Sequence, residues 1–137
     1  MHHGIKVRRI NVMKKNIISS ADVPVAGPYS AAVEARDLIF ISGQLPIDPT
    51  TGELISDIQK ATRQILVNIR SLLKKTDLDL SHIVKTTIFL KNIKDFADVN
   101  EVYADFFPVE PPARSTIEVS VLPRGALIEI EAIAVRN

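Results

Sequence analysis

The chain has 137 residues, of which 46% are apolar and 24% charged, and its formal net charge is +1. This length suits a single domain with one hydrophobic core. The absence of cysteine excludes a disulfide framework, a thiol nucleophile and any zinc or iron–sulfur site with cysteine ligands. No apolar run reaches the ~18 residues that indicate a membrane span, so we expect a soluble protein without a membrane partner.

The positive charge is concentrated at the N-terminus. Residues 22–137 hold 12 of the 17 basic residues and all 16 acidic ones, a balance of −4. We therefore expect residues 1–13 to be a basic extension or residues added in cloning, and residues 14–137 to form one domain. We expect a cytoplasmic protein, although an acid-free, basic arm is also typical of organellar targeting. The acidic body, the few aromatics and the lack of a basic stripe make a nucleic-acid partner improbable.

The first half of the domain predicts a loop, a strand and a helix. Two prolines and a glycine in Val23–Ser30 indicate a shaped loop. Leu38–Ser42 is typical of a strand buried on both faces. Ser56–Thr76 predicts a helix that begins with a capping box formed by Ser56 and Gln59.

The second half predicts a strand at Ile83–Lys91 and a helix capped by Asp95 that ends at the prolines from residue 108 onward. The remainder is expected to be a hairpin of Ala113–Val121 and Leu127–Val135, and His82 is expected to be structural or exposed. The fold class is therefore α+β, with a mixed five- or six-stranded sheet and two helices on one face.

Two helices cover only one face of such a sheet, yet both faces carry apolar residues. In the strand that begins at Ile83, alternation sends Val84, Ile88 and Leu90 one way and Ile83 and Phe89 the other. Because large exposed apolar patches mark association surfaces, we expect a homo-oligomer packed through the sheet.

Arg114 is the first candidate for binding chemistry. Ile117 and Val119 are taken as the core side of their strand, so Arg114, Thr116 and Glu118 are expected to point towards the subunit contact. The planar fork of an arginine can grip a carboxylate through two parallel hydrogen bonds. The alternative is a surface arginine paired with Glu118 or with nothing.

Two carboxylates share one face of the last strand. Glu129 and Glu131 alternate with Ile128 and Ile130. They form either a solvated outer face or a cleft in which one of them faces Arg114 across the hairpin and activates water. Burial would raise the pKa of that carboxyl and a nearby arginine would lower it, and the sequence leaves this open. No phosphate loop, nucleophile elbow or metal-ligand cluster is present, so no metal site is predicted.

Six segments in register, within Ile17–Arg136, make the chain resemble the Rid/YjgF family of reactive intermediate deaminases, formerly labelled translation inhibitors or perchloric-acid-soluble proteins. The segments are Gly27–Ser30 (GPYS), Ile41–Pro46 (ISGQLP), Val84–Thr87 (VKTT), Val99–Tyr103 (VNEVY), Pro112–Ser115 (PARS) and Ile128–Ala134 (IEIEAIA).

The resemblance implies a fold, an assembly and an activity. The fold is a chorismate-mutase-like domain, and three copies form a homotrimer with a central barrel and a ligand cleft at each interface. The activity is cofactor-free hydrolysis of 2-iminopropanoate and 2-iminobutanoate, or their enamine tautomers, to 2-oxo acids and ammonia. Pyridoxal-phosphate dehydratases release these intermediates, so the functional link is to such enzymes.

The resemblance also assigns roles to residues. Arg114 matches the carboxylate-binding arginine, Glu129 the water-activating carboxylate and Tyr29 the cleft tyrosine. Ser42 and Gly43 match a loop that meets the ligand through backbone and hydroxyl groups. Thr116 stands where many members have cysteine, and we expect activity to survive because the hydrolysis needs no covalent nucleophile.

Other functions remain open on the sequence. The alternatives are a non-catalytic trimer that binds small carboxylates and, with less support, an endoribonuclease or translation inhibitor. A chaperone-like role is a further possibility that the sequence does not test.

Overall fold

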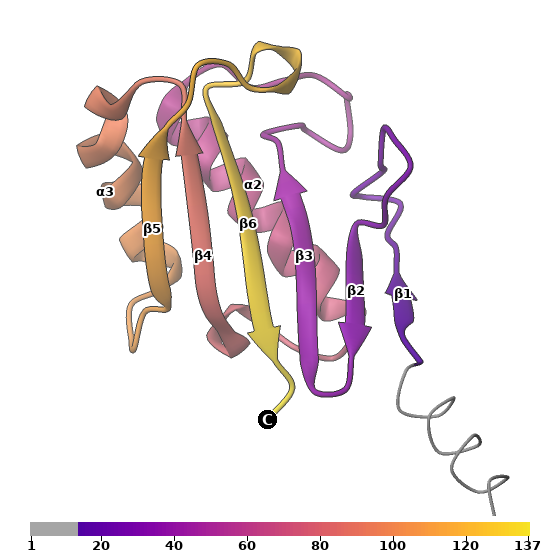
Figure 1. Ribbon diagram of the computed structural model, residues 1–137. Coiled ribbons are helices and arrows are strands. Elements are labelled where there is room, and N and C mark those ends of the chain that lie inside the picture. Colours follow the sequence, from indigo (N-terminus) through magenta and orange to yellow (C-terminus); the bar gives the residue numbers. More distant parts are fainter. Residues whose placement is uncertain (1–13) are drawn as a thin grey trace, which may run out of the picture.

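The computed structural model describes residues 14–137 (Figure 1). The extension predicted at residues 1–13 therefore lies outside the described residues. The described chain forms one sheet with strand order β1-β2-β3-β6-β4-β5, in which only the β4–β5 pair is parallel. The strands are β1 (Asn16–Ile18), β2 (Ala32–Ala35), β3 (Leu38–Gln44), β4 (Ile83–Leu90), β5 (Ala113–Glu118) and β6 (Ile128–Val135), and the helices are α2 (Ile58–Lys74) and α3 (Phe96–Phe106).

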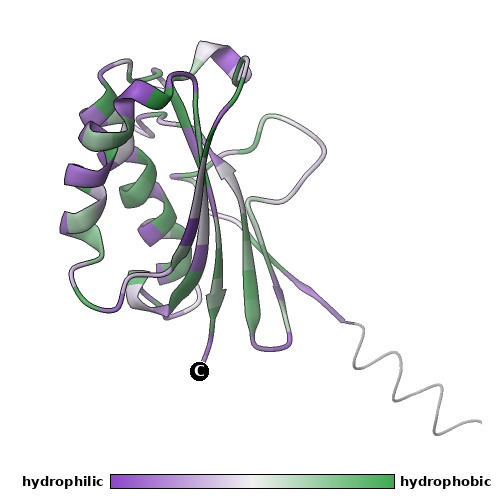
Figure 2. Cartoon of the chain, turned by 60° about the vertical axis from the view of Figure 1, so that its left-hand side comes forward, coloured by the Kyte–Doolittle hydropathy of each residue, from purple (hydrophilic) through white to green (hydrophobic). Residues whose placement is uncertain are grey.

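Both helices lie on the same face of the sheet, and the opposite face is bare (Figures 1 and 2). This confirms the predicted α+β class with a mixed, six-stranded sheet. Neither helix within residues 14–137 is long and apolar enough to cross a membrane. The core lies between α2 and the central strands, where Ile65, Leu66, Ile88, Leu90 and Ile130 are fully buried.

The predicted C-terminal hairpin is wrong. Strand β5 pairs only with β4, in parallel, whereas β6 lies between β3 and β4 and is antiparallel to both. The reason is the helix between β4 and β5: a strand–helix–strand crossover returns the chain in its original direction, so β5 runs parallel to β4. Strand β6 then enters the centre of the sheet.

The helix starts also differ from the prediction. Asp57 rather than Ser56 caps α2, because its Oδ2 accepts a hydrogen bond of 2.9 Å from the Lys60 amide. Gln59 takes no part in a capping box and instead donates to the Asp98 carbonyl on α3. Asp95 precedes α3 but makes no capping hydrogen bond through its side chain.

Two predicted side-chain directions are reversed. A bulge between Ile83 and Lys85 turns Val84 outwards, leaving it 47% exposed, while Ile83 is buried with Ile88. In β5, Arg114 and its alternate neighbours face the helices, because α3 presents polar and aromatic partners there. Ile117 therefore faces the bare side, where its register partner is Phe89.

The bare face of the sheet is largely apolar. A cross-strand row runs from Ile17 through Val33, Phe40 and Ile133 to Lys85. Ile17, Phe40 and Ile117 are 57%, 43% and 46% exposed in the single chain. The expected uncovered apolar face is thus confirmed.

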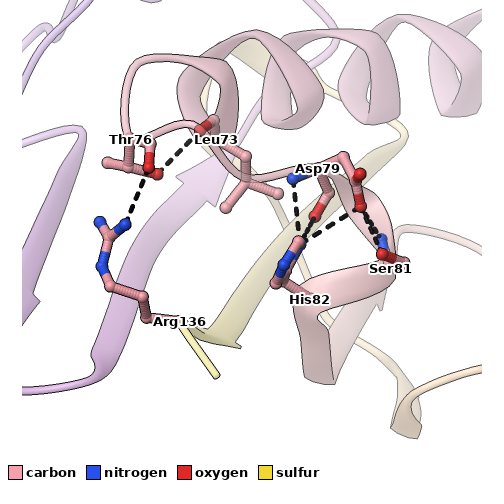
Figure 3. Close-up of polar contacts among 6 residues, drawn as sticks. All are labelled: Leu73, Thr76, Asp79, Ser81, His82 and Arg136. Carbon is pink, nitrogen blue, oxygen red and sulfur yellow. Dashed lines mark hydrogen bonds and ion pairs between the residues drawn. The ribbon is translucent and has the colours of Figure 1, made fainter.

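Polar contacts fix the ends of the elements that close the core (Figure 3). Arg136, just after β6, donates to both carboxylate oxygens of Glu34 at 2.7 and 3.0 Å and to the Thr76 carbonyl at 3.0 Å. His82 accepts a hydrogen bond from the Asp79 amide at 3.2 Å, and Asp79 caps the turn through the Ser81 amide. The predicted structural role of His82 is confirmed.

Replacement of Ile88 by alanine should lower the free energy of unfolding by about 2–5 kcal/mol, because it opens a cavity in a fully buried position. Urea denaturation followed by circular dichroism measures this change. Val109→Ala, at a side chain that is 77% exposed, is the matched control and should stay within about 0.5 kcal/mol of the parent. Equal effects of the two substitutions would contradict the placement of Ile88 in the core.

Candidate active site

Arg114 is held by side chains of α3. Its Nη2 donates to Asn100 Oδ1 at 2.7 Å, and its guanidinium carbon lies 4.8 Å from the ring centroid of Tyr103 and 5.4 Å from that of Phe96. The contact with Asn100 is its only hydrogen bond within residues 14–137. The rest of the planar fork is thus oriented but uncommitted, as a carboxylate-binding group requires.

The support behind Arg114 is itself fixed. The Tyr103 hydroxyl and Thr86 Oγ1 form a buried hydrogen bond of 2.7 Å. Burial raises the pKa of Tyr103, so the ring that stacks on the guanidinium stays neutral near pH 7. The alternative pairing of Arg114 with Glu118 is wrong, because the Glu118 carboxylate accepts a hydrogen bond from the Ile93 amide at 2.9 Å.

Thr116 lies on the same side of β5, two residues beyond Arg114. Its Oγ1 is buried and has no hydrogen-bond partner among the described residues. A buried hydroxyl without a partner is unfavourable by about 1–3 kcal/mol. Thr116 therefore has unused hydrogen-bonding capacity next to the arginine.

Glu129 lies on the bare face of the sheet, next to a glycine. A Cβ built on Gly43 would lie 2.1 Å from Glu129 Oε2, so the carboxylate occupies the space that any other residue at 43 would fill. Gly43 belongs to a register shift of β3 between Ile41 and Gln44, opposite β6. The glycine and the bulge together make room for the carboxylate.

Burial raises the pKa of Glu129, and repulsion from the Glu131 carboxylate raises it further. Arg114 does not counteract these effects, since it lies on the helix side of the sheet. The two effects that the sequence left in competition are therefore separated in space. A carboxyl with a raised pKa is better suited to exchange protons near neutral pH.

Ser42 and Tyr29 lie close to Gly43, Ser42 as its neighbour in the chain and Tyr29 in the wall of the same cavity. The Ser42 hydroxyl donates to the Ser30 carbonyl at 2.6 Å, and its amide donates to the Ala31 carbonyl at 2.9 Å. Ser42 thus ties the loop that carries Tyr29 to β3. Tyr29 is 53% exposed and, with Gly43, lines a cavity of about 90 Å³.

The predicted site residues therefore fall into two groups. Arg114 and Thr116 face α3, whereas Ser42, Gly43 and Glu129 lie towards the bare face. The predicted meeting of Arg114 and Glu129 across a hairpin does not occur within one chain. No group of three or more metal-ligating side chains is found in residues 14–137.

Sequence reasoning missed the groups that orient Arg114. Asn100 and Tyr103 lie three residues apart, the spacing that puts two side chains on one helix face. Both lie in Val99–Tyr103, one of the segments that carry the family resemblance, and neither was assigned a role. Their place in that segment was the signal available in the sequence.

The expected lack of a basic stripe is also wrong. Lys60, Arg63, Arg70 and Lys74 are exposed along one side of α2, which contains no acidic residue. However, Asp98, Glu101 and Asp105 are exposed on the adjacent α3, and Asp105 pairs with Arg63 at 3.7 Å. The acidic helix offsets the field of the basic one, which weakens a polyanion-binding interpretation.

Replacement of Glu131 by glutamine should lower the pKa of Glu129, because it removes the like charge. The pKa should stay above 4.5, the ordinary value, since burial makes the larger contribution. Carbon-13 NMR titration of the glutamate carboxyl groups measures this shift. Glu118→Gln on β5 is the control and should leave the Glu129 titration unchanged. An unaltered pKa in Glu131→Gln would contradict the assigned electrostatic coupling.

The comparisons with known proteins match most of this chain. The family model described as endoribonuclease L-PSP matches residues 20–136. A RutC family protein of Pyrococcus horikoshii is 48% identical over 90% of this chain and 99% of its own length. Reactive Intermediate Deaminase A, chloroplastic, of Arabidopsis thaliana is 47% identical over 89% of this chain and 66% of its own length.

A solved structure supports the same relationship. The crystal structure of Escherichia coli TdcF with bound serine superposes with a TM-score of 0.85 at 39% identity, and the match covers 89% of this chain and 99% of TdcF. The segments that carry the candidate site residues all lie within the matched region. The chain belongs to the Rid/YjgF family, whose family model is described as endoribonuclease L-PSP.

Proposed function

We propose that this protein is a cofactor-free deaminase that hydrolyses 2-imino acids such as 2-iminopropanoate and 2-iminobutanoate. The products are 2-oxo acids and ammonia. The observation that carries the proposal is that the chain holds two groups suited to this chemistry. One is the Arg114 guanidinium, which α3 orients and leaves largely free of hydrogen bonds, and the other is the half-buried Glu129 carboxylate, whose pKa is raised. A 2-imino acid needs one group to hold its carboxylate and one to activate water at C2.

The proposed site requires two copies of the chain, because Arg114 and Glu129 lie on opposite sides of the sheet. The apolar bare face, with Phe40 and Ile117 exposed, supplies a surface through which copies can associate. In the proposed assembly, packing through this face would bring the Glu129 side of one copy towards the edge strand β5 of another. We propose the homotrimer with a central barrel implied by the family resemblance, with one cleft at each interface.

Arg114 is proposed to bind the substrate carboxylate through two parallel hydrogen bonds. Asn100 and Tyr103 position the guanidinium in advance, so little ordering is needed when the substrate arrives. We propose that the Thr116 hydroxyl, which lies on the same side of β5 and has no partner among residues 14–137, contacts the same ligand. Thr116 stands where many family members have cysteine. This difference leaves the proposed reaction intact, because the hydrolysis forms no covalent intermediate with the protein.

Glu129 is proposed to take a proton from water as the water oxygen attacks C2 of the protonated imine. The addition forms a tetrahedral amino alcohol. Glu129 then returns its proton to the nitrogen, and the C–N bond breaks with its electron pair leaving on ammonia. The Glu129 carboxylate accepts the hydroxyl proton as the carbonyl forms, and this proton passes to ammonia to give ammonium. A barrier reduction of ~3–5 kcal/mol is within reach of one positioned base and one charge clamp.

The relatives support this substrate class. The Arabidopsis relative carries the name Reactive Intermediate Deaminase A, and TdcF binds serine, which has the same arrangement of carboxylate, C2 and nitrogen. Pyridoxal-phosphate dehydratases acting on serine or threonine release the proposed substrates. A non-catalytic trimer that binds small carboxylates at the same cleft is the competing proposal, since Arg114 alone would suffice for binding.

Arg114→Ala should abolish the rate enhancement on 2-iminobutanoate generated in the assay by threonine dehydratase, because the substrate carboxylate loses its partner. Arg114→Lys should recover little, since an ammonium lacks the planar fork. Glu129→Gln should retain binding of 2-oxobutanoate but lose hydrolysis. Absorbance of semicarbazone products follows the imine, and calorimetry follows binding. Full activity in Arg114→Ala would dismiss the anchor, and wild-type protein that binds without turnover would favour the non-catalytic trimer.

Phe40→Glu should convert the assembly to folded monomers, because it puts a charge in the middle of the apolar row on the bare face. Sedimentation velocity at micromolar concentration measures the assembly state. Val67→Glu, on the helix side between Arg63 and Arg70, is the matched control and should leave the assembly unchanged. A wild-type monomer would overturn the proposed composite site.

A further inference from the structure

The cavity lined by Tyr29 and Gly43 adjoins the proposed reaction site. The cavity of about 90 Å³ is lined by Tyr29 and Gly43 of that site, and also by the loop from Asp22 to Ala26, by Leu45 and Ile47, and by Arg124. Gly43 is shared: the Glu129 carboxylate packs against it, and the same residue forms part of the cavity wall. One glycine therefore separates the proposed water-activating group from the cavity.

The cavity wall is apolar in its chemistry. Half of its twelve lining residues are aliphatic, namely Val23, Pro24, Val25, Ala26, Leu45 and Ile47. The two amides in the wall already have partners: Gln44 Nε2 donates to the Ser42 carbonyl at 3.0 Å, and Asn68 Nδ2 donates to the Ile47 carbonyl at 2.9 Å. With both amides committed, the wall is aliphatic apart from Tyr29 and the two charged residues Asp22 and Arg124, and it suits an apolar group.

The charges of the wall do not favour an acidic ligand. Asp22 and Arg124 carry opposite signs, and Arg124 directs Nη2 to the Gly52 carbonyl at 3.4 Å. A ligand with a second carboxylate would meet one cation and one anion in the same wall. The balance of charge and the six apolar residues together point to a neutral, aliphatic occupant.

The volume sets the size of this occupant. An apolar protein cavity of about 150 Å³ holds benzene, with six carbons. This cavity is open on one side, where Val25 and Tyr29 are 43% and 53% exposed, so its volume measures the sheltered part of an occupant. By the same scale, about 90 Å³ shelters roughly three or four carbons. We propose that this cavity is the side-chain pocket of the reaction site and selects 2-imino acids with aliphatic side chains of three or four carbons, such as the imine derived from leucine. The proposal rests on the proposed function for the position of the reacting carbon.

Binding of 2-oxo acid products to the full chain tests the pocket independently of turnover. By calorimetry, 4-methyl-2-oxopentanoate should bind about tenfold more tightly than pyruvate, within the range that added methylene groups contribute in an apolar pocket. Phenylpyruvate should gain less than this, because its benzyl group is too large. Ala26→Leu adds three carbons to an exposed wall position and should remove the preference while leaving pyruvate affinity within about twofold. Ala104→Leu, an equal change at an exposed position of α3, is the control and should keep the preference.

Each other outcome has a distinct meaning. Equal binding of pyruvate and 4-methyl-2-oxopentanoate by the wild type, or an equal loss of both in Ala26→Leu, overturns the pocket. Tighter binding of 2-oxoglutarate than of 4-methyl-2-oxopentanoate overturns the aliphatic assignment in favour of a role for Arg124. The predicted order of binding without hydrolysis of any imine keeps the pocket and contradicts the deaminase. Absence of binding by all four 2-oxo acids contradicts both.

Discussion

Alternation along β6 determines which groups can act together in this protein. Ile128, Ile130, Ala132 and Ala134 face the helices and are buried. The intervening positions, Glu129 among them, must therefore face the bare side, because successive side chains of a strand point to opposite faces. A one-residue slip would bury both glutamates in the core and expose the isoleucines. The position of Glu129 thus follows from the hydrophobic core itself.

Arg114 is subject to the same rule on another strand, with the opposite result. Its strand lies at the edge of the sheet beside α3, which offers an amide oxygen and two aromatic rings in place of aliphatic packing. Stacking and one hydrogen bond hold the guanidinium while most of its N–H groups stay uncommitted. The fold therefore prepares a cation and a carboxylate with rigid surroundings but keeps them on separate sides, where they do not neutralise each other.

Much of this arrangement could be predicted from the sequence, for identifiable reasons. The periodic stripe of α2 and the short apolar strands are local patterns, and they gave the fold class and the uncovered face. The pairing of β5 depends on the crossover through α3, which no local pattern records. The directions of Val84 and Ile117 depend on a bulge and on what α3 presents, so alternation alone misassigned them. Asp57 and Ser56 are both good helix caps, and only the geometry of the first turn distinguishes them.

For the site, Gly43 was found through the resemblance, but its contact with Glu129 is a tertiary contact that spacing does not reveal.

The two edges of the sheet are poorly suited to growth. Strand β1 has three residues, and β5 directly follows Pro111 and Pro112, which lack amide hydrogens for pairing. Short strands and prolines at an edge discourage the addition of another strand, and open-ended stacking of this kind leads to fibres. An apolar face of this size would be an aggregation hazard on a sheet with long, free edges. With both edges blunted, the proposed association of copies is left to the bare face, and face-to-face contacts can close on themselves into a finite assembly.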